Sequence, residues 1–179
     1  MAKKNNAKKT LKKQKYNIIV SVFAFLIVLS LIGVLTSFIK NRKIAKYDEE
    51  IIVLKANDSE IDSVSLKELR KGESASVNIY LNNQEKKITL EGVSLEKVIN
   101  NLKIDTTKFT KLETKNKNGT KSSISIDTAL EPDRVYLVYK LNSQAIYDYN
   151  NSFGYFAIID SQSKDSSDWI LDVREINLK

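Results

Sequence analysis

Residues 91–104, EGVSLEKVINNLKI, combine the end of a strand with the start of a helix. Gly92 closes an apolar strand pattern, and Ser94 is a residue type that caps helices. One apolar helical face follows at the i, i+3, i+4 and i+7 spacing, formed by Leu95, Val98, Ile99 and Leu102. The stretch therefore predicts a strand that leads directly into an amphipathic helix with Ser94 as its cap.

A second short helix and a hairpin are predicted just upstream. Ser65 and Glu68 have the Ser-x-x-Glu spacing of a capping box, which predicts a helix over 66–71 that ends at Gly72. Residues 74–81 and 86–90 then read as the two strands of a hairpin around the polar turn 82–85. The β-branched run 50–56 predicts another strand, followed by a polar turn at 57–62.

Five further strands are predicted downstream, at 109–115, 121–126, 134–141, 155–159 and 169–178. The run at 134–141, RVYLVYKL, is apolar on both faces in part, which favours a central position in a sheet. The alternation in 169–178 shifts phase and indicates a bulge. Together these elements predict the α+β class: a mixed β-sheet domain with two short helices over residues 47–179.

The order of these motifs resembles the sulfite-oxidase-like molybdopterin-binding domain family. VSLKELRKG at 64–72 resembles that family's leucine helix, and EGVSLEKVINNLKI resembles its G-V-x-L segment that opens a helix. Residues 113–146, ETKNKNGTKSSISIDTALEPDRVYLVYKLNSQAI, and 153–178, FGYFAIIDSQSKDSSDWILDVREINL, are similar to its central and closing patterns. The resemblance covers about residues 61–178 and implies the family's fold.

Departures from the family pattern argue against the family's chemistry. The family's Cys ahead of the G-V-x-L segment supplies a thiolate to molybdenum, and the matching residues 74–90 contain no Cys. The whole chain has no Cys and no His, so thiolate and imidazole ligands are both missing. We expect no cofactor, no metal and no catalytic residue set, and hence a protein that is not an enzyme.

Residues 18–39, IIVSVFAFLIVLSLIGVLTSFI, contain no charged side chain. At about 1.5 Å per residue a helix of this length reaches about 33 Å, which exceeds a hydrocarbon core of about 30 Å. A cleaved signal peptide would have a shorter apolar region and small residues after it. The stretch predicts one N-terminal transmembrane helix that acts as an uncleaved signal anchor.

The basic residues of the chain gather around this apolar stretch. Residues 1–46 hold eleven of the 29 Lys and Arg residues and none of the 22 acidic ones, seven before the stretch and four after it. This bias predicts a basic cytoplasmic tail at 1–15, the anchor and a juxtamembrane helix at 16–46, and an extracytoplasmic domain at 47–179 on the cell membrane. The mildly acidic domain argues against nucleic-acid binding.

Aromatic and acidic residues concentrate between positions 136 and 155. Tyrosine offers a large contact area with a polar group, which favours a binding surface, although packing between strands would use the same residues in the core. The predicted surface consists of Tyr136, Tyr139, Tyr147, Asp148, Tyr149, Phe153 and Tyr155.

Three functions follow from the sequence. The first is a single-pass membrane-anchored extracytoplasmic binding protein with a cofactor-less molybdopterin-binding-like domain, with membrane lipid around 18–39 and a protein in or outside the membrane as partners. The second is a divergent membrane-bound oxidoreductase or a pterin- or small-ligand-binding protein, which would need a deep apolar pocket. The third is a scaffold or assembly subunit of a membrane complex, in which the tail and helix carry the specificity.

Overall fold

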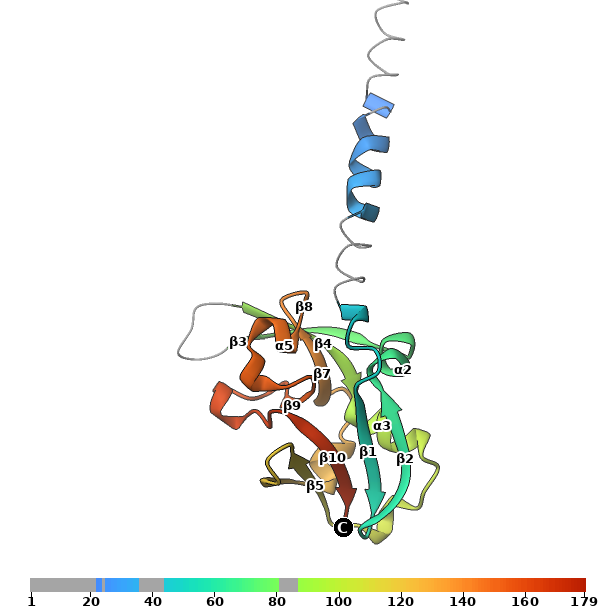
Figure 1. Cartoon of the computed structure of the whole chain (residues 1–179), viewed down its shortest axis with the longest axis vertical. Coiled ribbons are helices and arrows are strands. Elements are labelled where there is room, and N and C mark those ends of the chain that lie inside the picture. Colours follow the sequence, from blue (N-terminus) through green and yellow to red (C-terminus); the bar gives the residue numbers. More distant parts are fainter. Residues whose placement is uncertain (1–21, 24, 36–43, 81–86) are drawn as a thin grey trace, which may run out of the picture. The chain divides into compact units, whose positions relative to one another are not determined.

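The computed structural model describes residues 22–23, 25–35, 44–80 and 87–179, and the chain divides into two units, Met1–Arg42 and Lys43–Lys179. In the first unit the described residues are helical (Figure 1), and their large apolar side chains are between 49% and 67% exposed. No helix within the described residues is long and apolar enough to cross a membrane. The predicted tail 1–15 and parts of the predicted spanning helix 18–39 lie outside the described residues.

The second unit contains a mixed five-stranded sheet with the order β2-β1-β10-β5-β6. Its strands are β1 (Ile51–Ala56), β2 (Ser59–Ser65), β5 (Lys111–Asn116), β6 (Lys121–Ser125) and β10 (Val173–Leu178). The first and last strands of the unit, β1 and β10, pair in parallel at its centre, while the other neighbours are antiparallel (Figure 1). A register shift in β10 between Val173 and Glu175 interrupts its pairing with β5, as the phase shift in this sequence predicts.

A second, antiparallel sheet surrounds β7 (Val135–Leu141), which pairs with β4 (Lys87–Ser94), β8 (Gln144–Ala145) and β9 (Ala157–Asp160), while β3 (Ala75–Tyr80) pairs with β4. Every residue of β7 is buried, so its predicted central position is confirmed. The predicted α+β class is confirmed, and its strands divide between two sheets. The division arises because the hairpin strands and β9 pair around β7, and not with β1 or β5.

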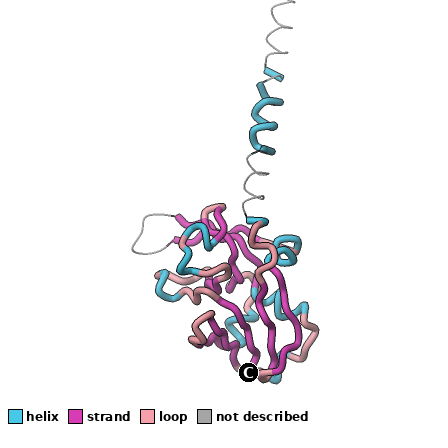
Figure 2. Tube along the Cα trace, in the orientation of Figure 1, coloured by secondary structure: helices cyan, strands magenta, loops and turns pink. Residues whose placement is uncertain are grey.

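Short helices connect the strands, as Figure 2 shows: α2 (Leu66–Lys71), α3 (Leu95–Asn101), α4 (Ile126–Leu130) and α5 (Ile146–Tyr149), with 3-10 turns at Thr106–Lys108, Asn151–Phe153 and Ser166–Asp168. The predicted capping box at the start of α2 is confirmed by reciprocal hydrogen bonds of Ser65 and Glu68. The predicted cap of α3 is wrong, because the Ser94 side chain is buried and makes no capping hydrogen bond.

Two strands differ from the sequence prediction: β2 occupies part of a predicted turn, and β4 continues through Gly92 to Ser94. The predicted turn at 57–62 is in part the strand β2, whose polar side chains fit an exposed sheet edge. At the register shift in the pairing of β4 with β7, Gly92 lies so close to β7 that an added Cβ would be 2.3 Å from the Leu137 carbonyl oxygen. The prediction that a hairpin turn occupies 82–85 falls on residues outside the described ranges.

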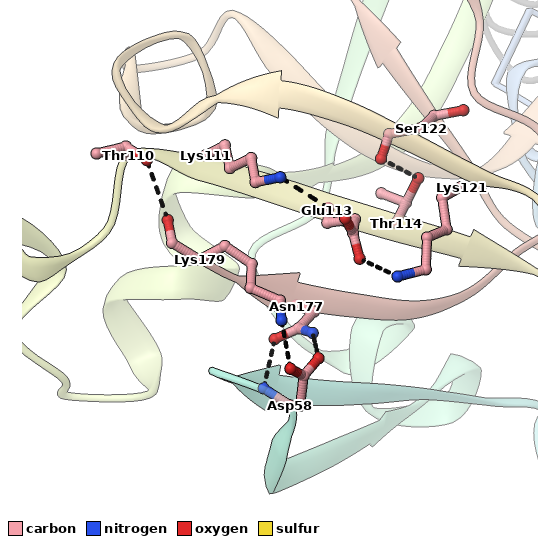
Figure 3. Close-up of polar contacts among 9 residues, drawn as sticks. All are labelled: Asp58, Thr110, Lys111, Glu113, Thr114, Lys121, Ser122, Asn177 and Lys179. Carbon is pink, nitrogen blue, oxygen red and sulfur yellow. Dashed lines mark hydrogen bonds and ion pairs between the residues drawn. The ribbon is translucent and has the colours of Figure 1, made fainter.

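The mixed sheet is apolar on one face and charged on the other. The apolar face carries Ile52, Leu54, Leu112 and Ile176 in the main core cluster. On the charged face Glu113 lies between Lys111 and Lys121, at 3.8 Å and 2.8 Å, and Asn177 and Lys179 both contact Asp58 (Figure 3). Because one face is charged and faces solvent while the other is apolar and buried, the core and the helices must lie on a single side of this sheet.

Candidate binding surface

The chain enters the second unit through residues 44–50, and this segment is packed into the domain. Ile44 is 1% exposed and belongs to the same core cluster as Ile52. The backbone N–H of Leu66 donates to the Glu50 carbonyl at 2.8 Å, and Arg70 of α2 pairs with Asp48 at 2.5 Å. The segment is therefore fixed against the start of α2.

Three tyrosine rings meet beside this segment. Tyr147 of α5 stacks on Tyr155, with centroids 4.7 Å apart and planes inclined by 14°. Tyr47 contacts both rings at an angle, with centroids 5.0 Å from Tyr155 and 5.5 Å from Tyr147. All three rings are partly buried, so each keeps some surface open to solvent. Offset and edge contacts at these distances are the favourable arrangements for aromatic pairs.

Charged groups of both signs border the three rings. Asp148 accepts a hydrogen bond from the Tyr47 hydroxyl at 2.7 Å and from the Lys46 Nζ at 2.9 Å. On the other side, the Arg174 guanidinium lies 4.9 Å from the centroid of the Tyr155 ring, within the range of a cation–π contact. We call these six residues the junction cluster: Lys46, Tyr47, Tyr147, Asp148, Tyr155 and Arg174.

Acidic neighbours hold Arg174 in place. Its guanidinium pairs with Glu50 at 2.8 Å and with Asp172 at 3.2 Å. Glu50 belongs to the segment through which the chain enters the unit, and Asp172 precedes β10. The guanidinium is thus held against the ring by groups from both ends of the domain sequence.

The protonation of the cluster follows from these contacts. Hydrogen bonding, first with Tyr47 and then with Asp148, raises the pKa of Lys46 to about 12, so this side chain is a cation at neutral pH. Burial is the main cause that raises the pKa of the Tyr47 hydroxyl and of the Tyr155 hydroxyl above the ordinary value. Both phenols are therefore neutral hydrogen-bonding groups at physiological pH.

The residues of the predicted surface fall into three places. Tyr147, Asp148 and Tyr155 come together in the junction cluster. Tyr149 and Phe153 form a neighbouring group in which Phe153 contacts the buried Trp169 edge-on, with centroids 6.3 Å apart. The last two residues of the set, Tyr136 and Tyr139, lie in the core.

Tyr136 and Tyr139 are 3% and 1% exposed and belong to the core, not to a surface. Both lie on β7, whose two faces are covered, so alternation along the strand takes neither ring to solvent. This corrects the prediction for these two positions. The pKa of Tyr139 is raised, with burial as the largest cause.

Sequence reasoning missed Lys46, Tyr47 and Arg174. Tyr47 lies about a hundred positions from Tyr147, and Arg174 belongs to the last strand, so no local spacing connects them. The available signal was the topology itself. Because β1 pairs with β10, the segment before β1 must lie near the residues that lead into β10.

The residues present do not fit a molybdenum cofactor held as in the family that the sequence resembles. The position just ahead of Gly92 is Glu91, whose carboxylate pairs with the Lys140 Nζ at 2.5 Å. The Lys140 side chain is 8% exposed, so this charged pair is set into the sheet. A carboxylate paired with a cation is a hard donor and not the soft sulfur donor that suits molybdenum, and residues 74–90 contain no Cys that could supply one.

Comparison with known proteins gives a fold relationship. No protein-family model matches the chain, and no curated protein matches it. Among solved structures it is similar to the crystal structure of the sulfane dehydrogenase SoxCD from Paracoccus pantotrophus, with a TM-score of 0.56 and 10% sequence identity. The similarity covers 74% of this chain and 38% of that chain, so the present chain spans well under half of its length. The comparison supports a distant sulfite-oxidase-like fold.

Proposed function

We propose that the chain is a single-pass membrane-anchored extracytoplasmic binding protein that recognises a protein partner through the junction cluster and holds no molybdenum cofactor. The observation that carries this proposal is the arrangement of three partly exposed tyrosines with a cation on either side of them. Tyrosine and arginine are the residue types that dominate binding energy at protein interfaces. The fold is similar to part of a sulfane dehydrogenase, but residues 74–90 of this chain contain no Cys that could donate a sulfur to molybdenum.

The anchor is supported by the sequence and by the described helical residues. The stretch 18–39 has no charge, and the apolar side chains described within it are about half exposed or more. Soluble monomers rarely expose a contiguous apolar surface of that kind. The heavier basic cluster on the N-terminal side favours a cytoplasmic N-terminus and, with it, an extracytoplasmic domain.

The junction cluster and the proposed anchor are close in the sequence. Residues 44–50 are fixed to the domain, and Lys46 follows position 39 by only seven residues. A membrane protein or an envelope component is therefore the kind of partner that we infer.

Co-purification from native membranes tests the proposal. The full-length protein is compared with Tyr147→Ala and with the control Tyr80→Ala, which removes a tyrosine that is 66% exposed and lies on β3. We expect a specific partner with the wild type and the control, and at least about tenfold less of it with Tyr147→Ala, as for an interfacial hot spot. Equal recovery from both variants, with unchanged thermal unfolding, would rule out the junction cluster as the binding site.

A further inference from the structure

A groove separate from the junction cluster runs along β2, the edge strand of the mixed sheet. It has a volume of about 450 Å³ and lies between the apolar face of the sheet and the helices α2 and α3. Its floor is apolar and consists of Leu54, Val64, Leu69, Val93, Val98 and Leu102. The floor is contributed by the three strands β1, β2 and β4 and by the helices α2 and α3 with the residue that follows α3, all fixed by the core, so the groove is preformed.

The rim of the groove is acidic. Four carboxylates line it: Asp62 of β2, Glu68 of α2, Glu73, and Glu96 of α3. Lys97 is the one cation among the described lining residues, and its Nζ is 3.3 Å from the carboxylate of Glu73 in an exposed pair. An exposed ion pair of this kind contributes little free energy, so a cation of a ligand can take the place of Lys97 beside Glu73 with little loss of stability. Lys67 and Lys71 of α2 do not line the groove.

Among the rim carboxylates, Glu68 already stabilises the start of α2 through the capping box. Glu68 accepts hydrogen bonds from the backbone and the hydroxyl of Ser65, and these bonds lower the pKa of its carboxyl group. The Glu68 carboxylate is therefore ionised at physiological pH. Asp62 accepts one hydrogen bond from the Ser63 backbone N–H and Glu96 one from the Asn100 side-chain amide, and Glu73 makes the exposed pair with Lys97. Because a carboxylate has about four acceptor positions, all three can also accept from a ligand.

The edge of β2 offers backbone hydrogen-bonding groups beside the groove. Among the described strands β2 pairs with β1 alone, so its other edge is free. Asp62 lies opposite Leu54 and Val64 lies opposite Ile52 in the register, and alternate residues therefore face the groove. An extended segment added to this edge would direct every second side chain onto the apolar floor.

We propose that this groove binds an extended basic peptide, with lysine side chains at alternate positions in the groove. The aliphatic part of a lysine lies on the apolar floor while its ammonium group reaches the acidic rim, a division that suits long cationic side chains. Backbone pairing with β2 provides the remaining affinity. An acidic peptide is excluded by repulsion from the rim carboxylates. This site is independent of the junction cluster and of the partner bound there.

Fluorescence anisotropy with a labelled seven-residue peptide that alternates lysine and threonine tests the proposal, using the full-length protein in detergent micelles. We expect saturable binding that weakens with added salt, and about tenfold weaker binding to Asp62→Asn/Glu96→Gln, which removes two rim charges. The matched control is Glu49→Gln/Asp127→Asn, which removes two exposed charges outside the groove and leaves binding unchanged. Tyr147→Ala is also expected to bind normally, which separates this site from the junction cluster.

A second variant distinguishes a loss of binding at the groove from a loss of the folded structure. Asn101→Lys places a cation on the groove wall at an exposed position, and it should abolish binding with unchanged thermal unfolding. Equal binding to Asp62→Asn/Glu96→Gln and to its control would overturn the proposal. So would equal binding of a peptide with Nε-acetyl-lysine, or displacement of the peptide by an equal concentration of spermidine, which would indicate a site for small cations.

Discussion

Gly92→Ala is expected to destabilise the domain strongly, because the backbone of β7 leaves no room for a side chain at this position of β4. A Cβ at Gly92 would lie 2.3 Å from the Leu137 carbonyl oxygen, 2.8 Å from the Val138 Cα and 2.9 Å from the Leu137 carbonyl carbon. All three are backbone atoms of a strand that is buried along its whole length, so no flexible side chain can move aside.

The magnitude follows from the cost of overpacking. Extra methylene groups in a packed core cost about 1–3 kcal/mol, and contact with backbone atoms places this substitution at the upper end or beyond it. For a domain of this size about 3 kcal/mol corresponds to a fall of roughly 10–15 °C in the Tm. Thermal unfolding of the full-length protein in detergent, followed by circular dichroism, measures this fall.

Gly72→Ala is the matched control. The nearest atoms to a Cβ there are two carbonyl oxygens at 3.6 Å, an ordinary contact, and Gly72 has a φ of −76° that any residue adopts. The free energy of unfolding should change by less than about 1 kcal/mol, because the loss of freedom in the unfolded chain on replacing glycine with alanine offsets any crowding in the folded state. If Gly92→Ala melted within about 2 °C of the wild type, the close approach of the β7 backbone to Gly92 would be refuted.

Three further predictions concern the loop before β9, the charged sheet face and the tyrosines. Gly154→Ala should lower the Tm, because the φ of Gly154 is +71° and a Cβ would lie 2.2 Å from the Asp172 carboxylate; thermal unfolding measures this. Hydrogen bonding to Lys121 lowers the pKa of Glu113 in the folded state, so its stabilisation exists above the unfolded pKa and is lost as pH falls through the folded pKa. As the pH falls from about 5 to about 3, the free energy of unfolding measured by urea titration should therefore decrease less for Glu113→Gln than for the wild type. Because the pKa of Tyr47 is raised, Tyr47→Phe should remove a late step from the alkaline absorbance titration of tyrosinate, and an unchanged titration would contradict the packing of Tyr47.

Local sequence patterns predicted the elements that depend on neighbouring residues. Ser65 and Glu68 predicted α2 to the residue, since a capping box is satisfied within one turn. The apolar run at 134–141 predicted a central strand because burial on both faces leaves few polar positions. Both are cases in which the physical cause lies within a few residues of its effect.

Elements that depend on distant pairing could not be predicted in the same way. The polar strand β2 has the composition of a loop and is extended because β1 provides its hydrogen-bonding partner. The burial of Tyr136 and Tyr139 arises from a second sheet that the sequence pattern did not separate from the first. The junction cluster joins residues from both ends of the domain, and only the parallel pairing of β1 with β10 brings them together.

The central claim is that the domain lies outside the cytoplasm and binds a partner at the junction cluster. Because the chain has no Cys, Gln144→Cys introduces a single thiol at an exposed position two residues before α5. A matched thiol, Lys117→Cys, lies in the exposed turn between β5 and β6.

Labelling intact cells with a membrane-impermeant maleimide that carries a photo-cross-linker tests both parts of the claim at once. The account predicts that both thiols are labelled and that light produces one discrete cross-linked protein from position 144 and none from position 117. Labelling only after the membrane is permeabilised would contradict the orientation. Efficient labelling at position 144 with no cross-linked protein would contradict binding at the junction cluster.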